Sequence, residues 1–332
     1  MKFGLFLDAE APADGDLGTL LDELIEQSQV ASEVGFDMVG MGQHYLLDSP
    51  MAQLMPTLGR LSAAVGDDTE LFTAILLLPL HHPVEIAEQI GTLSHLVDGI
   101  QVGVGAGYID HEFRNFGVPK STRVGRLIES IEVLNRLWTE ENVSYDGEFY
   151  SLEDATISAR PETKPELWYG AHAPVAVRRA ARIADRWITV PQNTLSELAE
   201  RKTEYDEIRA DTDKPTSVPM LREGYVAPTT EEAFDRSIDS FQHKYSKYLE
   251  RELGESSLEI TEDSVTSREG FEEYVENRFV IGSPEEICAQ IEQYDDELDL
   301  SHFLFRVRRP GMDHQDAIDA IELFGDEVIP NV

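Results

Sequence analysis

The stretch LFTAILLLPLHHPVEIAEQIGTLSHLVDGIQVGV, from Leu71 to Val104, decides the fold class. It begins with an apolar run over 71–77 that predicts a strand, and it ends with a second such run over 100–104. Apolar residues between the two runs are spaced by four, three and four positions, which places them on one face of a helix. These residues are Ile86, Ile90, Leu93 and Val97. A strand, a helix and a second strand in this order predict parallel strands joined by a crossover helix.

The same alternation continues on both sides of this unit. Strand-like runs lie at 2–7, 36–41, 167–170, 187–190, 220–227 and 302–307. Helical patterns lie at 19–34, 53–65, 127–138, 176–184, 195–210, from 231 onward, and at 315–328. Eight strand-then-helix units in this length predict an α/β fold of the (β/α)8 TIM-barrel type. The alternative is an open doubly wound sheet, but no glycine fingerprint for a dinucleotide follows the first strand.

We therefore expect a single domain over 1–332. Two stretches do not fit the repeat and are predicted to be excursions at the C-terminal rim of the barrel, at about 141–165 and 243–279. The sequence Ser283-Pro284-Glu285-Glu286 predicts a capped helix start, because serine, proline and glutamate stand at the positions that a capping box requires.

The charge excludes two classes of partner. The chain has 64 acidic and 27 basic residues and a formal net charge of −37. This balance excludes binding to nucleic acid by bulk charge, and an anionic membrane surface would repel the chain. Only 7 of the 27 basic residues are lysine, and such an acid-rich, lysine-poor composition indicates a halophilic archaeal source. We therefore expect the protein to lose structure in low salt.

Neither a disulfide nor a metal centre is expected. Cys288 is the only cysteine, so an internal disulfide and a multi-cysteine metal site are both excluded. His81 and His82 are neighbours without a third ligand at motif spacing. The chain opens on a strand-like run and contains no apolar run of membrane-spanning length, so we expect a cytoplasmic location.

Several segments, taken in chain order, resemble the bacterial-luciferase-like oxidoreductases, which use a flavin or the deazaflavin coenzyme F420. The matching stretches are Gly35-Phe36-Asp37 with Gln43-His44, then 78–89, 103–117, 126–138, 147–150 and 180–187, followed by 282–286 and 309–312. The resemblance implies a (β/α)8 barrel with an insertion. It also implies a flavin or deazaflavin at the C-terminal mouth of the barrel, where the chemistry of such barrels takes place.

Candidate site residues follow the predicted strands. His44 is a candidate general acid or base, because an imidazole titrates near neutral pH. Glu112 is the second candidate catalytic residue, and the resemblance places its carboxylate near the ring or the substrate. The candidate cofactor-binding residues are Ala74, Ile75, Gly105, Ala106, Gly107, Tyr108, His172, Ala173, Val175 and Ala176.

These cofactor-binding residues have different expected roles. The resemblance implies a cis peptide between Ala74 and Ile75 if the cofactor is a deazaflavin, whereas a plain buried strand is the alternative. The glycines after the fourth strand allow backbone to approach a flat ring. The helix start at 173–176 offers free N–H groups to a phosphate.

The chain departs from the family pattern at four positions. Gln43 replaces the usual acidic residue before the histidine, and Ile100 replaces an arginine that often starts the fourth strand. Ala106 stands where luciferases carry an arginine for the flavin phosphate. Asp48 stands where deazaflavin-dependent sugar-phosphate dehydrogenases carry a tryptophan, so a sugar-phosphate substrate is not expected.

Three functions are compatible with these observations. The first is a monooxygenase that uses reduced FMN and oxygen on a small organic substrate, with a separate flavin reductase as partner. The second is a dehydrogenase or reductase that uses coenzyme F420. The third is a non-catalytic flavin-binding protein, since a fold can keep its ligand after losing its chemistry. A homodimer is left open, and the substrate depends on the excursions, above all on 243–279.

Overall fold

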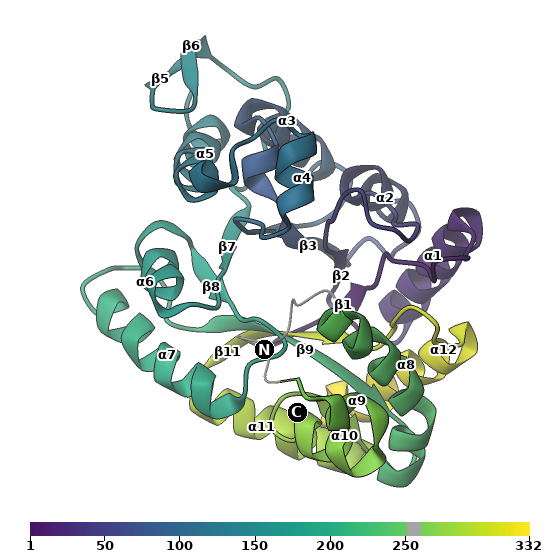
Figure 1. Ribbon diagram of the computed structural model, residues 1–332. Helices are drawn as coiled ribbons and strands as arrows, with labels where there is room; N and C mark the ends of the chain where they lie inside the picture. The colour runs from purple at the N-terminus through teal and green to yellow at the C-terminus, as the bar shows by residue number, and fades with distance from the viewer. Residues whose placement is uncertain (251–259) are drawn as a thin grey trace.

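The computed structural model describes residues 1–250 and 260–332. It shows a curled parallel sheet surrounded by helices (Figure 1). In the described part the strand order is β10-β9-β11-β1-β2-β3-β4-β7-β8. These strands are β1 (Lys2–Leu7), β2 (Met38–Met41), β3 (Glu70–Leu76), β4 (Ile100–Val104), β7 (Glu166–Gly170), β8 (Arg186–Ile188), β9 (Val218–Val226), β10 (Val280–Gly282) and β11 (Leu300–Arg306). The backbone N–H of Thr189 donates to the carbonyl of Pro219 over 3.1 Å, which brings β8 beside β9 and closes the ring. The predicted (β/α)8 barrel is therefore confirmed.

The helices lie on the outside of this ring (Figure 1). They are α1 (Leu17–Glu33), α2 (Leu54–Leu61), α3 (Pro83–Leu93), α4 (Asp110–Asn115), α5 (Arg123–Thr139), α6 (Pro174–Ile183), α7 (Leu195–Arg209), α8 (Thr230–Glu250), α9 (Glu262–Thr266), α10 (Arg268–Val275), α11 (Pro284–Leu298) and α12 (His314–Glu327). The predicted capping box at Ser283 is present at the start of α11. No helix in the described ranges is both long and apolar enough to cross a membrane.

The two expected excursions have different structures. The stretch 141–165 contains an antiparallel hairpin of β5 (Val143–Asp146) and β6 (Ser151–Ala155). The stretch 243–279 contains the end of α8, then α9 and α10, while residues 251–259 of the expected excursion lie outside the described residues. Directly after it comes β10, a ninth strand that the sequence pattern did not predict. It has only three residues and pairs with the end of β9, so it is too short to show a period.

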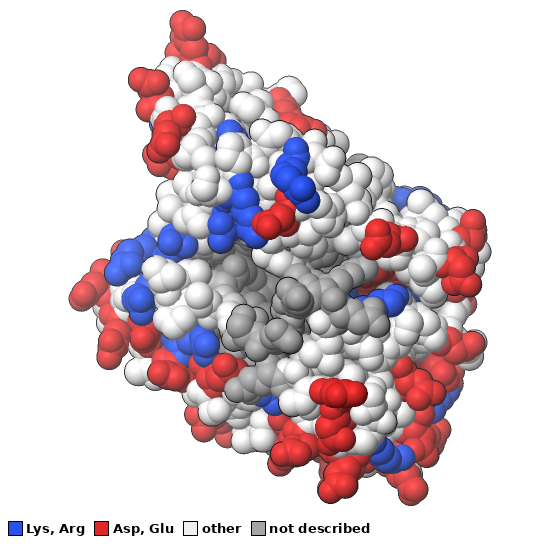
Figure 2. All heavy atoms as spheres, in the orientation of Figure 1, with Lys and Arg blue, Asp and Glu red and all other residues white. Residues whose placement is uncertain are grey.

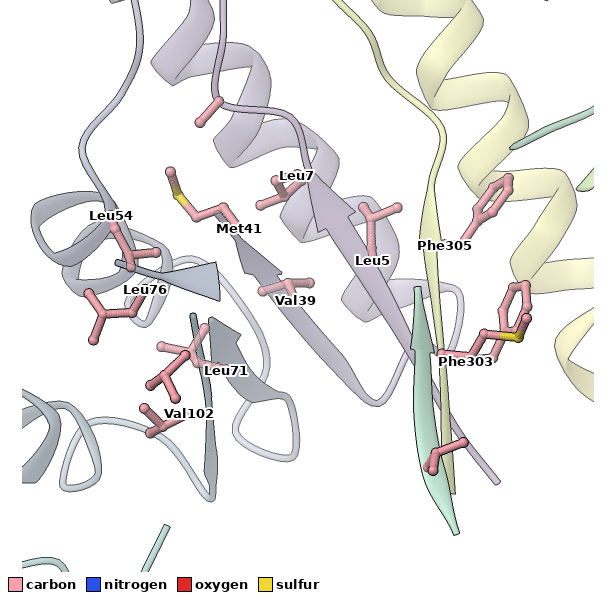
Figure 3. Packing of buried hydrophobic residues seen from close by; sticks show 14 of the residues in the cluster. Leu5, Leu7, Val39, Met41, Leu54, Leu71, Leu76, Val102, Phe303 and Phe305 are labelled. Carbon is pink, nitrogen blue, oxygen red and sulfur yellow. The ribbon is translucent and has the colours of Figure 1, made fainter. Parts of the chain in front are cut away.

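Alternate strand residues fill two different cores. Residues that point outward, such as Leu5, Val39 and Phe303, pack with the surrounding helices (Figure 3). Residues that point inward form a second cluster inside the barrel. These are Phe6, Met38, Phe72, Ala74, Trp168, Ile188, Leu221 and Leu304, with Ile75 packed against them. The inward cluster forms the floor beneath the C-terminal mouth.

Candidate active site

One half of the mouth is built from glycines at the ends of β4 and β7. A Cβ atom added to Gly105 would overlap with Cδ1 of Ile75, and one added to Gly170 would lie 3.2 Å from its Cγ2. The Ile75 side chain therefore lies across both strand ends. The peptide between Ala74 and Ile75 is cis, so the alternative of a plain trans strand at this position is wrong. We call this region, Ile75 with Gly105 and Gly170, the glycine half.

The loop after β4 continues this surface. Gly107 has a φ of +71°, a conformation that favours glycine, and Ala106 is half-buried. Tyr108 is 50% exposed, and its ring lies edge-on to His44 with centroids 5.7 Å apart. The structure thus brings the predicted residues 105–108 together with His44.

Gly105→Ala tests whether the glycine half holds a ring. The added methyl group should push the Ile75 side chain into the mouth, because only the flexible end of that side chain is in the way. We expect cofactor affinity to fall about tenfold with little loss of stability. Ile75→Val removes the obstructing methyl, so the double variant should recover most of the affinity. Fluorescence titration with F420 and FMN measures this, and unchanged affinity for both would place the ring elsewhere.

His44 and Glu112 form a pair on the other side of the loop. His44 follows β2, and Glu112 lies in α4. Nδ1 of His44 is 3.1 Å from Oε1 of Glu112, and the backbone N–H of Tyr45 donates to the same oxygen over 2.7 Å. Because an ionised carboxylate only accepts, the pair favours the tautomer with a proton on Nδ1. Among the described residues Nε2 has no hydrogen-bond partner, so its lone pair is available to a ligand.

Glu112 keeps a second acceptor unused. Its side chain is fully buried, and Oε2 has no hydrogen-bond partner among the described residues. A buried carboxylate oxygen without a donor is unfavourable unless a ligand or water supplies one. The pair therefore presents one acceptor, on His44, toward the mouth and keeps a second one, on Glu112, buried behind it.

A hydrogen-bond network of neutral side chains, which the sequence did not reveal, lies next to the His44–Glu112 pair. It consists of Gln43, Tyr45 and His81. The Gln43 amide donates to the Tyr45 hydroxyl over 2.5 Å, and its oxygen accepts from the Leu77 N–H over 3.1 Å. His81 Nε2 is 3.1 Å from both the Tyr45 hydroxyl and the Gln43 oxygen. Burial raises the pKa of Tyr45 to about 12 and lowers the pKa of His81. Gln43 stands where the family has an acidic residue. Both ends of its amide group are therefore used in hydrogen bonds within the protein.

The start of α6 has two free donors rather than the three expected. The N–H of Ala176 already donates to the carbonyl of Ala173 over 2.8 Å, which corrects the prediction for that residue. Ala173 and Val175 are exposed, and their N–H groups have no acceptor in the part of the chain that the structure describes. His172 Nδ1 is 3.0 Å from the Asn193 amide oxygen, so this imidazole is turned toward α7.

The other half of the mouth is ionic, which the sequence pattern did not reveal. Asp8, Glu223 and Arg306 extend the inward positions of β1, β9 and β11, and Lys244 comes from α8. We call these four residues the ionic half. Arg306 binds Asp8 through two nitrogens, and Lys244 Nζ is 2.5 Å from Glu223 Oε1.

Burial and charge act against each other in the ionic half. Burial would raise the pKa of Asp8 and Glu223, but the neighbouring cations Arg306 and Lys244 outweigh it and lower both pKa values. Burial lowers the pKa of Lys244 to about 8. The two acids are therefore held ionised.

No cluster of three or more histidine, cysteine, aspartate or glutamate side chains suited to a metal occurs among the residues that the structure describes. His81 belongs to the neutral network, and His82 accepts from the Val84 N–H at the start of α3.

A sequence model of the luciferase-like monooxygenases matches residues 1–299. The chain belongs to this family. Two F420-dependent glucose-6-phosphate dehydrogenases are similar over nearly the whole length. That of Microbacterium testaceum is 29% identical over 94% of this chain and 93% of its own, and that of Amycolatopsis mediterranei is 30% identical over 93% and 94%. As a luciferase-like family member with such relatives, the protein is an oxidoreductase.

Solved structures show the same luciferase-like fold. The monooxygenase RslO1 from Streptomyces bottropensis superposes with a TM-score of 0.84, covers 99% of both chains and is 22% identical. At that identity the likeness shows the architecture alone. It agrees with the barrel.

Proposed function

We propose that this luciferase-like protein is an F420-dependent oxidoreductase that oxidises a small alcohol or reduces the corresponding carbonyl compound. The His44–Glu112 pair carries the proposal, because it presents a base at the mouth of a chain whose full-length relatives are named F420-dependent dehydrogenases. The relatives favour this reading over the expected FMN monooxygenase. A catalytic pair with unused acceptors also disfavours a mere flavin-binding role.

The residues present fit a deazaflavin. The glycine half lacks side chains where Gly105 and Gly170 face Ile75, so a flat ring can approach the backbone. The part-exposed imidazole of His44 can accept through Nε2 from an N–H of the ring or from a substrate hydroxyl, while the fully buried Glu112 holds it from below. The free N–H groups of Ala173 and Val175 suit the cofactor phosphate without a positive side chain.

The chain's own groups would handle the proton. Bound F420 supplies the hydride acceptor or donor. In alcohol oxidation Nε2 of His44 takes the hydroxyl proton, while Glu112 holds the Nδ1 proton and stabilises the imidazolium that forms. The neutral network at Gln43 and Tyr45 holds the loop that carries His44. Reduction of a carbonyl compound uses the same groups in reverse.

A sugar phosphate is not the proposed substrate, although the two relatives are named for one. Asp48 stands at the position where the resemblance implies a tryptophan for such substrates. In the ionic half Arg306 and Lys244 each bind a carboxylate of the chain itself, which does not favour a phosphate. A homodimer remains a prediction, and the proposed reaction needs no flavin reductase.

Reaction with oxygen separates this proposal from the FMN alternative. The protein is mixed with F420 and a panel of primary and secondary alcohols, and loss of the visible absorbance of F420 is followed. In parallel it is mixed with reduced FMN in air. We expect F420 reduction by members of the panel and no acceleration of flavin oxidation. Rapid oxygen consumption with reduced FMN together with an oxygenated product would overturn the proposal.

Val175→Pro tests the phosphate position. Proline is tolerated in the first turn of a helix, so the variant removes one free N–H with little effect on the fold. Affinity for F420 should fall several-fold, whereas affinity for its phosphate-free deazaflavin riboside should stay the same, because one donor to the phosphate is lost. Equal losses for both ligands, measured by fluorescence titration, would mean that the phosphate binds elsewhere.

A further inference from the structure

Five arginines on the helices that follow β4 and β7 form no salt bridge among the described residues, although the chain carries 64 acidic residues. None of the five has a carboxylate within 4.0 Å among the described residues. We call this group the arginine rim, and it consists of Arg114, Arg123, Arg126, Arg179 and Arg182.

Their partners are carbonyls, hydroxyls and rings. Arg123 donates to the Lys120 carbonyl over 3.1 Å, and Arg182 donates to the Arg178 carbonyl over 3.4 Å. Arg126 donates to the Thr122 hydroxyl over 3.2 Å, with its guanidinium 5.2 Å from the centre of the Phe149 ring. Arg179 donates to the Tyr169 hydroxyl over 3.2 Å. These contacts orient four of the guanidinium groups without a salt bridge. Arg114 and Arg123 also act at longer range on Asp110, whose pKa is lowered first by its partner Lys120 and further by these two arginines.

The fold brings these arginines to one side of the barrel. Arg114 lies in the last turn of α4, Arg123 and Arg126 lie at the start of α5, and Arg179 lies in α6. Arg182 lies in the last turn of α6, at the end of that helix away from the mouth. The helices α4 and α5 follow β4, and α6 follows β7, the two strands whose ends make the glycine half. Figure 2 shows basic side chains gathered over α4, α5 and α6, whereas acidic ones predominate on the hairpin β5–β6 and around α8 to α12.

Elsewhere most surface arginines are paired with acids. Arg136 is 3.2 Å from Glu140, and Arg236 is 2.7 Å from Asp319. Arg60, Lys214 and Lys247 also have no acidic partner among the described residues. Arg60 and Lys247 lie apart on α2 and α8, whereas Lys214 donates to the Arg182 carbonyl at the end of α6. With a net charge of −37 the long-range field of the protein repels anions. A group of guanidiniums without salt bridges then favours the binding of an anionic chain on this side of the barrel.

We propose that the arginine rim binds the oligoglutamate tail of coenzyme F420, an inference that rests on the proposed function. The tail extends from the cofactor phosphate and carries a carboxylate on each glutamate. If the cofactor phosphate binds at the start of α6, the tail that extends from it begins beside α5 and α6, the helices that carry most of the arginine rim. Guanidinium groups bind carboxylates through paired N–H donors, which suits flexible carboxylates in any order.

Tail length gives a direct test. The triple variant R114Q/R123Q/R179Q is compared with wild type and with R60Q, a control that removes an arginine away from the rim. Ligands are the deazaflavin riboside without phosphate or tail, and F420 with a short or a long tail. Fluorescence titration is done at the lowest salt concentration at which the circular dichroism spectrum is still that of the folded protein. Wild type should bind the long tail more tightly than the short one, and the triple variant should lose about tenfold or more of its long-tail affinity.

The controls separate this inference from the proposed function. Binding of the riboside should stay unchanged in the triple variant, and R60Q should behave as wild type. If tail length has no effect in wild type, or if R60Q loses as much affinity as the triple variant, the rim is not the tail site although F420 binding stands. If neither F420 nor the riboside binds, the proposed function itself fails.

Discussion

Replacing His44 by alanine is expected to lower turnover roughly 10²–10⁴-fold while F420 affinity stays within a few-fold. The imidazole is held by Glu112 over 3.1 Å, and its other nitrogen has no partner within 1–250 and 260–332, so the variant loses the proton acceptor and little binding surface. Initial rates with an alcohol that the wild type oxidises give turnover, and fluorescence titration gives affinity.

Two further variants make the test of His44 specific. His95→Ala is the matched control, because that exposed imidazole lies 3.0 Å from the Arg160 carbonyl, its hydrogen-bond partner in the described part of the chain. Glu112→Gln should give an intermediate loss, since the amide can still hold His44 but cannot stabilise its charged form. Full turnover in His44→Ala would show that the proton is taken by another group.

Glu223→Ala should destabilise the protein by about 3–5 kcal/mol, because it removes the buried carboxylate that Lys244 Nζ contacts inside the barrel. Chemical denaturation monitored by circular dichroism measures the free energy of unfolding. The pKa of Glu223 is lowered in the folded state. Its contribution to the free energy of unfolding is therefore fully present above the unfolded-state pKa of a glutamate. That contribution is lost as the pH falls through the folded-state pKa.

The double variant Glu223→Leu with Lys244→Met is the control for this effect. It removes both charges together, so most of the lost stability should return. If the double variant is as unstable as Glu223→Ala, the packing of these side chains and not their charge stabilises this half of the mouth.

The barrel could be predicted because its signals repeat. Each strand and helix carries an apolar period, as at Ile86 and Ile90, and the order of elements then restricts the topology. The strand β10 could not be predicted because three residues show no period. Order along the chain also located His44 and Glu112, since both follow strands whose ends meet at the mouth.

The ionic half could not be predicted from the sequence. Asp8 and Glu223 are two among 64 acids, and only the pairing of β11 between β1 and β9 brings them to Arg306. Lys244 reaches them from a helix whose packing on the barrel has no local signature. The inward position of Asp8, two residues after Phe6 in β1, is the one signal that could have indicated it.

Gln43 shows a different limit of prediction from the sequence. The sequence revealed a departure from the family acid, but not that both ends of the amide would be used by Leu77 and Tyr45. Likewise, helix periodicity placed Ala176 at the start of α6, while the tight turn that occupies its N–H depends on local backbone geometry.

Competition between F420 and FMN for the purified protein tests the central claim most directly. Dissociation constants of both oxidised cofactors are measured by fluorescence titration, and FMN is then used to displace bound F420. We predict that F420 binds at least tenfold more tightly than FMN and is not displaced by equimolar FMN, a difference of about 1.4 kcal/mol. Tighter binding of FMN, with displacement of F420, would contradict the account.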